Sequence, residues 1–280
     1  MASQMRNGIM TNGTAGPSQK RQAERTAQWH IAEEVPVALH YNGRSRLVMM
    51  ATPADLEDFG IGLSVTEQIV ASAADIRDIA IQKLPEGYIV DMAVDPELVA
   101  RYRLRQRGIT GRTGCGLCGV ESLAEALREL RPVTPRFTVE KAAVAAALAA
   151  LPDWQPMNSE NRSVHGAAWC APDGAIREAR EDVGRHNALD KLIGALLRSG
   201  RAPADGFFVM SSRCSFELVQ KVAVVGAPLL ATVSAPTTLA LSLAEATGIR
   251  LAAAAPEGVI EFDQVKLPEQ DGAIGDIAAQ

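Results

Sequence analysis

Two cysteines, Cys115 and Cys118, lie three positions apart in the glycine-rich stretch GRTGCGLCG at 111–119. The flanking glycines predict a flexible loop, because glycine lowers stability and is used where the backbone must move or approach a partner closely. The loop precedes a predicted helix at 120–130, so the helix dipole and the nearby Arg112 both favour the thiolate form of Cys118. A thiolate attacks sulfur and can carry it as a persulfide.

The cysteine pair by itself admits three kinds of site. A structural zinc site needs four ligands, and the chain has neither a second CxxC nor closely spaced histidines. A thioredoxin-like redox pair normally lies near a βαβ pattern, which the glycine-rich surroundings do not favour. A mobile sulfur carrier fits the pattern best of the three, and no metal is expected.

A second polar group lies in the stretch REDVGRHNALDK at 180–191, at the start of a predicted helix at 187–197. The side chains that could line a polar pocket are Glu181, Asp182, Arg185, His186, Asp190 and Lys191. A helix N-terminus favours anions. The same residues also suit a charged helix start held by i,i+4 pairs such as Asp182 with His186, so both interpretations stand.

A third group follows two predicted strands. Ser212, Arg213 and Ser215 come after a buried strand, and Ser234 and Thr237 come after the next strand. Open α/β sheets bind ligands beyond the carboxyl ends of their strands, so two such loops indicate a binding crevice more than two ordinary helix caps. A lone strand histidine such as His165 is usually structural, and Trp169 and Cys170 are typical of a core.

Composition excludes several classes of function. The 280 residues carry a net charge of −5 with only 4% aromatic residues, which argues against nucleic-acid binding by charge or by base stacking. No stretch of 18 apolar residues predicts a membrane span. The polar N-terminus lacks an apolar run of signal-peptide length, so we expect a cytoplasmic protein whose four cysteines stay reduced.

The pattern along the chain predicts an α/β protein. We expect a disordered tail at 1–28, an α+β N-terminal domain at 29–136 that ends in the cysteine loop and its helix, and a C-terminal domain at 137–280. The first domain should contain hairpins at 35–50 and 76–94, with a helix between them. The second should contain a mixed or mainly parallel sheet covered by helices, with its last strand at 249–253.

Alternating arginines at 101–107 have two interpretations. On a strand, the four arginines would share one face. They would form either a solvated edge that resists strand pairing or a wall that binds anions.

Taken together, these segments resemble the FdhD family of sulfurtransferases, which are required to make active formate dehydrogenase. The resemblance covers about 30–250 and rests on GRTGCGLCGVESL, REDVGRHNALDKLIG, SSRCSFELVQK and VSAPTTLA, in the order of the family. It implies that Cys115 accepts sulfur as a persulfide from a cysteine desulfurase, with Cys118 as its neighbour. The sulfur then passes to the molybdenum bis(molybdopterin guanine dinucleotide) cofactor of formate dehydrogenase.

The resemblance also implies a C-terminal domain similar to cytidine deaminase without its zinc chemistry, since neither His165 nor His186 begins an H-x-E motif. The expected cofactor-binding residues are Arg112, His165, Glu181, Asp182, Arg185, His186, Ser212, Arg213, Ser215, Ser234, Thr237, Ala254, Ala255, Pro256, Glu257, Gly258 and Val259. The last six depart from the family, which usually has an aromatic and a basic residue there.

Two further hypotheses compete with sulfur transfer. One is a chaperone that binds the molybdenum cofactor without carrying sulfur, and the other is a zinc hydrolase or deaminase. The expected partners are a cysteine desulfurase, formate dehydrogenase and the cofactor itself, with no nucleic acid and no membrane. The sequence leaves the oligomeric state open, a homodimer included.

Overall fold

A computed structural model describes residues 30–105 and 130–262, apart from the side chains of 103–105. The chain divides into a short unit, 1–31, and one compact unit, 32–280, to which everything below refers. The cysteine loop at 111–119 and the predicted tail at 1–28 lie outside the described residues. The predicted domain boundary near 136 stays a prediction.

The first sheet has four strands in the order β2-β1-β4-β3. Its strands are β1 (Val35–Tyr41), β2 (Arg44–Ala51), β3 (Ile76–Leu84) and β4 (Gly87–Val94), with β1 parallel to β4 and the other pairs antiparallel. Asn42 and Gly43 turn the first hairpin with φ of 53° and 73°. Two positive φ angles suit the twist of a tight hairpin, and the pairing of β1 with β2 confirms the hairpin predicted at 35–50. Helix α2 (Leu56–Thr66) and a 3₁₀ turn, η1 (Ala73–Asp75), connect the two hairpins.

The strand considered for 101–107 does not form in the described part of that segment, because helix α3 runs over Pro96–Arg105. The helix starts where Asp95 accepts a hydrogen bond from the Glu97 N–H, and proline at the first helical position needs no donor. Val99 and Tyr102, three positions apart, pack into the core of the first sheet. In a helix, alternate residues do not share a face, so the arginine wall loses its geometric basis.

The second sheet has six strands in the order β10-β9-β8-β7-β5-β6, and it is mixed. Its strands are β5 (His165–Cys170), β6 (Ile176–Asp182), β7 (Phe207–Cys214), β8 (Leu229–Pro236), β9 (Arg250–Ala255) and β10 (Gly258–Glu261). β7, β8 and β9 are mutually parallel, and the remaining pairs are antiparallel. The short strand β10 was not predicted. The predicted α/β class is confirmed.

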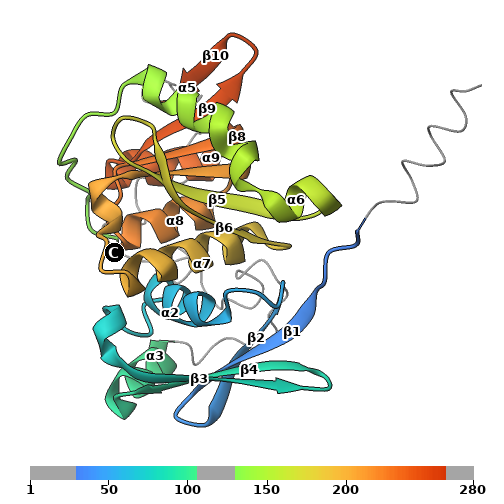
Figure 1. The fold of residues 1–280 in the computed structure, drawn as a ribbon. Helices are drawn as coiled ribbons and strands as arrows, with labels where there is room; N and C mark the ends of the chain where they lie inside the picture. The colour runs from blue at the N-terminus through green and yellow to red at the C-terminus, as the bar shows by residue number, and fades with distance from the viewer. Residues whose placement is uncertain (1–29, 106–129, 263–280) are drawn as a thin grey trace, which may run out of the picture. The chain divides into compact units, whose positions relative to one another are not determined.

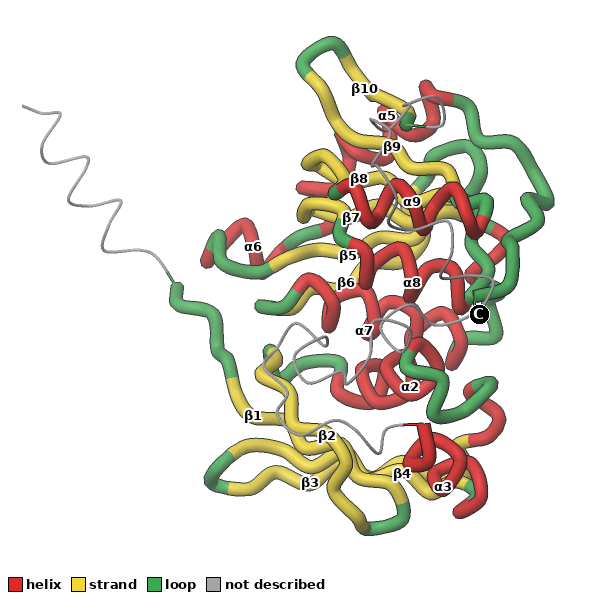
Figure 2. The backbone as a smooth tube through the Cα atoms, turned by 180° about the vertical axis from the view of Figure 1, so that it is seen from behind, coloured by secondary structure: helices red, strands yellow, loops and turns green. Residues whose placement is uncertain are grey.

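Helices cover both faces of this sheet (Figures 1 and 2). One face packs against α7 (Arg185–Arg198), α8 (Phe216–Val224) and α9 (Thr238–Thr247), and the other against α5 (Lys141–Ala150). Strand alternation divides the two cores, since Ala167 and Trp169 belong to the first and Ala168 and Cys170 to the second. The remaining elements are α6 (Pro156–Asn161) and the 3₁₀ turns η2 (Leu151–Trp154) and η3 (Pro203–Asp205).

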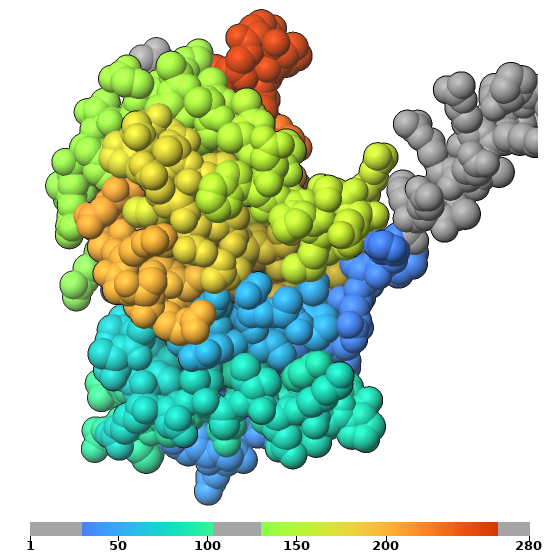
Figure 3. Space-filling model, viewed as in Figure 1, coloured from blue at the N-terminus to red at the C-terminus, as the bar shows by residue number. Residues whose placement is uncertain are grey.

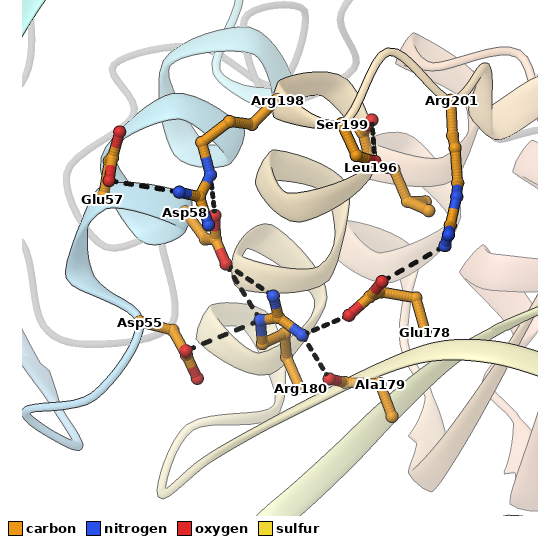
Figure 4. A network of polar contacts seen from close by, with 10 residues as sticks. All are labelled: Asp55, Glu57, Asp58, Glu178, Ala179, Arg180, Leu196, Arg198, Ser199 and Arg201. Atoms are coloured by element: carbon orange, nitrogen blue, oxygen red, sulfur yellow. Dashed lines mark hydrogen bonds and ion pairs between the residues drawn. The ribbon is translucent and has the colours of Figure 1, made fainter.

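Helix α2 packs directly against α7, and the space-filling view shows the blue and yellow parts of the chain in continuous contact (Figure 3). Asp58 of α2 is almost completely buried between two arginines (Figure 4). Its carboxylate lies 2.9 Å from Arg180 Nη2 and 2.8 Å from Arg198 Nε. These contacts tie the helix of the first sheet to the helix and edge strand of the second. None of the described helices is long and apolar enough to cross a membrane.

Candidate functional site

The polar residues that the sequence singles out lie at one end of the strands of the six-stranded sheet, and we call this line of strand ends the sheet edge. Because β7 is parallel to β8 and antiparallel to β5, the carboxyl ends of β7 and β8 lie at the same edge as the start of β5. His165 opens β5 and pairs in register with Asp182 at the end of β6, while Arg213 pairs with Ser234. Helices α7, α8 and α9 begin just beyond these strand ends. Their N-termini give this edge a partial positive charge.

His165, Arg185 and His186 gather at this edge. His165 is half-buried, and its pKa is lowered by burial first and then by the nearby Arg185 and His186, while Asp182 opposes the shift. A neutral imidazole beside a guanidinium group can donate or accept one hydrogen bond without adding charge. The structure therefore brings His165 together with Arg185 and His186, which the sequence places in two separate segments.

Glu217, which the sequence analysis missed, lies next to this group. Its carboxylate is 3.8 Å from His186 Nε2 and only 17% exposed. Burial alone would raise the pKa of Glu217, but His186, its own backbone N–H and Ser215 together lower it to about 2. An acidic residue in the first turn of a helix, two positions after a serine N-cap, was the available signal. Glu217 is therefore a fixed negative charge that faces His186.

The hydroxyl residues at the strand ends differ in exposure. Ser212 is buried and donates to the Arg213 carbonyl, whereas Arg213 and Ser234 are exposed. Ser215 is the buried N-cap of α8, and Thr237 caps α9 by accepting the Ala240 N–H at 3.3 Å. Arg213 and Ser234 are the most accessible members of this set, while the half-buried Thr237 still has a hydroxyl hydrogen to donate.

Glu181 and Asp182 contact protein groups. The Glu181 carboxylate accepts the backbone N–H groups of Met157 and Asn158, each at 2.8 Å, at the start of α6. Burial raises the pKa of Glu181, and these two hydrogen bonds oppose the shift. Asp182 is fully buried and binds four protein donors. Both carboxylates shape the edge from within the protein.

The segment at 254–259 forms the tip of the β9–β10 hairpin. Ala255 pairs with Gly258, whose φ is 121°, and Pro256 and Glu257 make the turn. Ala254, Pro256, Glu257 and Gly258 are exposed, Ala255 is half-buried and Val259 is buried. This tip offers backbone, methyl groups and the Glu257 carboxylate, but no cation, so it can bind a ligand by shape and by hydrogen bonds but not by charge attraction to phosphate.

The described cysteines are unsuited to nucleophilic chemistry. Cys170 and Cys214 are buried, and burial raises the pKa of each thiol to about 12. A thiol with that pKa holds almost no thiolate at neutral pH. Cys115, Cys118 and Arg112 lie outside the described residues. Within 30–105 and 130–262, no group of three or more His, Cys, Asp or Glu residues could hold a metal ion.

Comparisons with known proteins agree with one another. The model of the FdhD/NarQ family matches residues 32–261. A protein of Bordetella bronchiseptica named sulfur carrier protein FdhD is 46% identical over 222 residues, which are 79% of this chain and 80% of that protein. Its namesake from Cupriavidus necator is 48% identical over 222 residues, 79% of this chain and 77% of that protein.

A solved structure is also similar. It is described as a candidate formate dehydrogenase accessory protein from Desulfotalea psychrophila, and it superimposes with a TM-score of 0.65 at 27% identity. The match covers 84% of this chain and 88% of that chain, so the likeness extends through both sheets.

Proposed function

Because the chain belongs to the FdhD/NarQ family, we propose that it is a cytoplasmic sulfur carrier that supplies sulfur to the molybdenum cofactor of a formate dehydrogenase. The observation that carries the proposal is 46–48% identity to proteins named sulfur carriers over 79% of this chain. The accessory-protein description of the solved relative supports formate dehydrogenase as the enzyme served.

The cysteines that carry the sulfur are assigned as Cys115 and Cys118. The chain has four cysteines, and burial of Cys170 and Cys214 removes those two as nucleophiles. The sequence context of the other two, glycines and Arg112 before a helix, favours a thiolate. This argument by elimination is independent of the family resemblance.

Loading of the carrier is a thiol–persulfide exchange. The thiolate of Cys115 attacks the terminal sulfur of the persulfide on a cysteine desulfurase. A new S–S bond forms on Cys115, the S–S bond of the donor breaks, and the donor cysteine leaves as a thiolate. The step needs no oxidant or reductant, because the oxidation states of the exchanging sulfurs are only permuted. Cys118 assists or shares the persulfide.

The substrate that receives the sulfur is the molybdenum bis(molybdopterin guanine dinucleotide) cofactor, which we place at the polar sheet edge. Its phosphates suit Arg185, Arg213 and the N-termini of three helices. His165, His186, Ser234 and Thr237 would supply further hydrogen bonds, and the 254–259 tip would supply shape. Glu181, Asp182, Ser212 and Ser215 would keep these groups in place from within the protein.

Labelled sulfur tests the proposal. The full-length protein is incubated with a cysteine desulfurase and ³⁵S-cysteine, and the label is mapped by proteolysis. We expect label on the wild type and on a Cys170→Ala, Cys214→Ala control, and none on Cys115→Ala, Cys118→Ala. Label retained on that last variant would overturn the proposal. The label retained by Cys115→Ala and by Cys118→Ala separately shows which thiol carries the sulfur.

The chaperone alternative makes the opposite prediction in cells. If the chain only holds the cofactor, Cys115→Ala, Cys118→Ala still restores formate dehydrogenase activity to a strain that lacks the carrier. If it carries sulfur, the same variant restores none, although the protein accumulates to wild-type levels.

A further inference from the structure

A buried network around Asp182 joins two segments that are far apart in the sequence. Thr52 donates its backbone N–H to Asp182 Oδ2 at 3.0 Å across 130 positions. Asp182 Oδ1 accepts the Gly184 N–H at 2.8 Å and the Asn187 amide at 2.9 Å. The same carboxylate lies 2.7 Å from Lys191 Nζ. We call Thr52, Asp182, Asn187 and Lys191 the Asp182 network.

Other hydrogen bonds of the network are donated by α7 and the residues before it, and are accepted by Thr52 and the end of β2. Lys191 Nζ donates to the Thr52 carbonyl at 2.9 Å, and the Val183 N–H donates to the Thr52 hydroxyl at 3.1 Å. The Asn187 amide donates to the Met50 carbonyl at 2.8 Å. Thr52 therefore binds the end of β6 and the residue after it through its N–H and its hydroxyl, and binds Lys191 of α7 through its carbonyl.

The buried charges of the network carry a desolvation cost, which indicates that they serve to fix the position of a neighbouring element. Asp182 and Lys191 are both 0% exposed, so both charges are fully desolvated. A buried ion pair is often no more stabilising than well-packed apolar residues, and its best-attested use is to fix register between elements. The register fixed here is that of the first turn of α7 against Thr52, the residue that follows β2.

That turn carries the basic groups of the candidate site. Arg185 and His186 lie between Gly184 and Asn187, both of which Asp182 binds, and Asp182 pairs in register with His165. We propose that the Asp182 network is a positioning device: Thr52, seated on Asp182, holds the first turn of α7 so that Arg185 and His186 bind the anionic cargo. The inference rests on the proposed function and extends the site to the β2–α2 connection.

The chain contains a matched control network on the same helix. Asp190 accepts the Thr66 hydroxyl at 2.7 Å and lies 2.9 Å from Lys221 Nζ. It is likewise buried, although Lys221 is slightly more exposed than Lys191, and it joins α2 to α7 away from the N-terminus of α7. Loss of the Thr66 hydroxyl should therefore leave the sheet edge unchanged.

The test compares Thr52→Val, Thr52→Ser and Thr66→Val in the full-length protein. Valine keeps the shape and backbone contacts of threonine but removes the acceptor of the Val183 N–H, whereas serine keeps it. The probe is guanosine diphosphate, the nucleotide part of the proposed cargo, and the readout is its Kd by calorimetry. Hydrogen exchange over 182–190 reports local opening, and ³⁵S loading reports the cysteine loop.

We expect Thr52→Val to weaken guanosine diphosphate binding about fivefold, the value of one hydrogen bond, and to speed exchange in 183–188. Thr52→Ser and Thr66→Val should bind within about twofold of the wild type, and all three should load sulfur normally. Unchanged binding and exchange in Thr52→Val would overturn the inference. So would a uniform rise in exchange with an equal loss of loading, which marks general destabilisation. A wild type that neither loads sulfur nor binds the nucleotide would refute the proposed function instead, while the exchange comparison still judges the positioning.

Discussion

Gly62 of α2 and Gly194 of α7 face each other where the two helices cross. A Cβ on Gly62 would lie 2.8 Å from the Gly194 nitrogen, and one on Gly194 would lie 2.9 Å from the Gly62 nitrogen. Each added carbon would also overlap a backbone carbonyl, that of Asp190 or of Asp58. Backbone cannot move aside as a side chain can, so only glycine permits this approach. The contact of Thr66 with Asp190 across the two helices depends on it.

Alanine at either glycine should separate the helices. We expect Gly62→Ala and Gly194→Ala each to lower the free energy of unfolding by about 3 kcal/mol, the upper range for overpacking. The measurement is urea denaturation. Gly60→Ala is the control, because its Cβ would meet the side chains of Val90, Ile79 and Met92. Those can adjust, and alanine gains about 1 kcal/mol in helix propensity. Equal losses at positions 60 and 62 would contradict the backbone argument.

The buried cation of the Asp182 network should be sensitive to neutralisation. Lys191→Met leaves the Asp182 carboxylate in the interior without its counter-charge, so we expect a loss of about 3–5 kcal/mol in denaturant unfolding. Arg177→Met is the matched control, because the Arg177–Asp173 pair is separated by 3.9 Å and both side chains are more than half exposed. That change should cost less than about 0.5 kcal/mol. Similar losses of unfolding free energy in the two variants would contradict the conclusion that Lys191 and Asp182 form a buried ion pair.

The features that the sequence predicted correctly are those set by local chemistry. Asn42-Gly43 specifies a tight turn by itself, and it lies in the hairpin predicted at 35–50. The gathering of Arg213 and Ser234 at one edge follows from the rule that parallel strands share their carboxyl ends. Each of these inferences needs only a short window of sequence.

The features that the sequence could not predict depend on distant partners. The alternating arginines at 101–107 suit a strand. The segment is helical as far as Arg105 because Val99 and Tyr102, at helical spacing, pack into the core. Strand β10 has no long apolar run and exists because β9 offers it a backbone edge. From its own segment, Asp182 could be either a ligand contact or part of a charged helix start, and its hydrogen bond with Thr52, 130 positions away, shows that it faces inward.

Cys170 and Cys214 should react slowly with thiol reagents in the folded protein. In the native protein at about pH 8, iodoacetamide should leave Cys170 and Cys214 unmodified, because burial raises both pKa values to about 12 and blocks access. Peptide mass spectrometry before and after denaturation measures the difference, with full modification in denaturant as the internal control. Rapid native labelling of Cys214 would contradict its placement in the core.

Glu217 should make stability depend on pH in the acid range. Its pKa is about 2 in the folded protein against about 4.5 when unfolded, so its contribution is present above pH 4.5 and is lost as the pH falls towards 2. We expect Glu217→Gln to be less stable than the wild type by on the order of 2 kcal/mol at neutral pH, with the gap closing near pH 2. Urea unfolding at a series of pH values measures the gap. A gap that stayed constant with pH would mean that the carboxylate is not stabilised by His186 and Ser215.

His165 should titrate below its ordinary value because of its burial and its cationic neighbours. Burial is the largest cause, followed by Arg185 and then His186, while Asp182 pulls the other way. Removal of one cation should therefore raise the pKa of His165, and we expect Arg185→Gln to do so measurably in an NMR titration of the imidazole protons. Arg198→Gln is the control, since Arg198 is in the last turn of the same helix and pairs with Asp58. If both variants moved the titration equally, the effect would come from the net charge of the protein. A shift confined to Arg185→Gln would instead place this guanidinium beside His165, where both can contact the same bound anion.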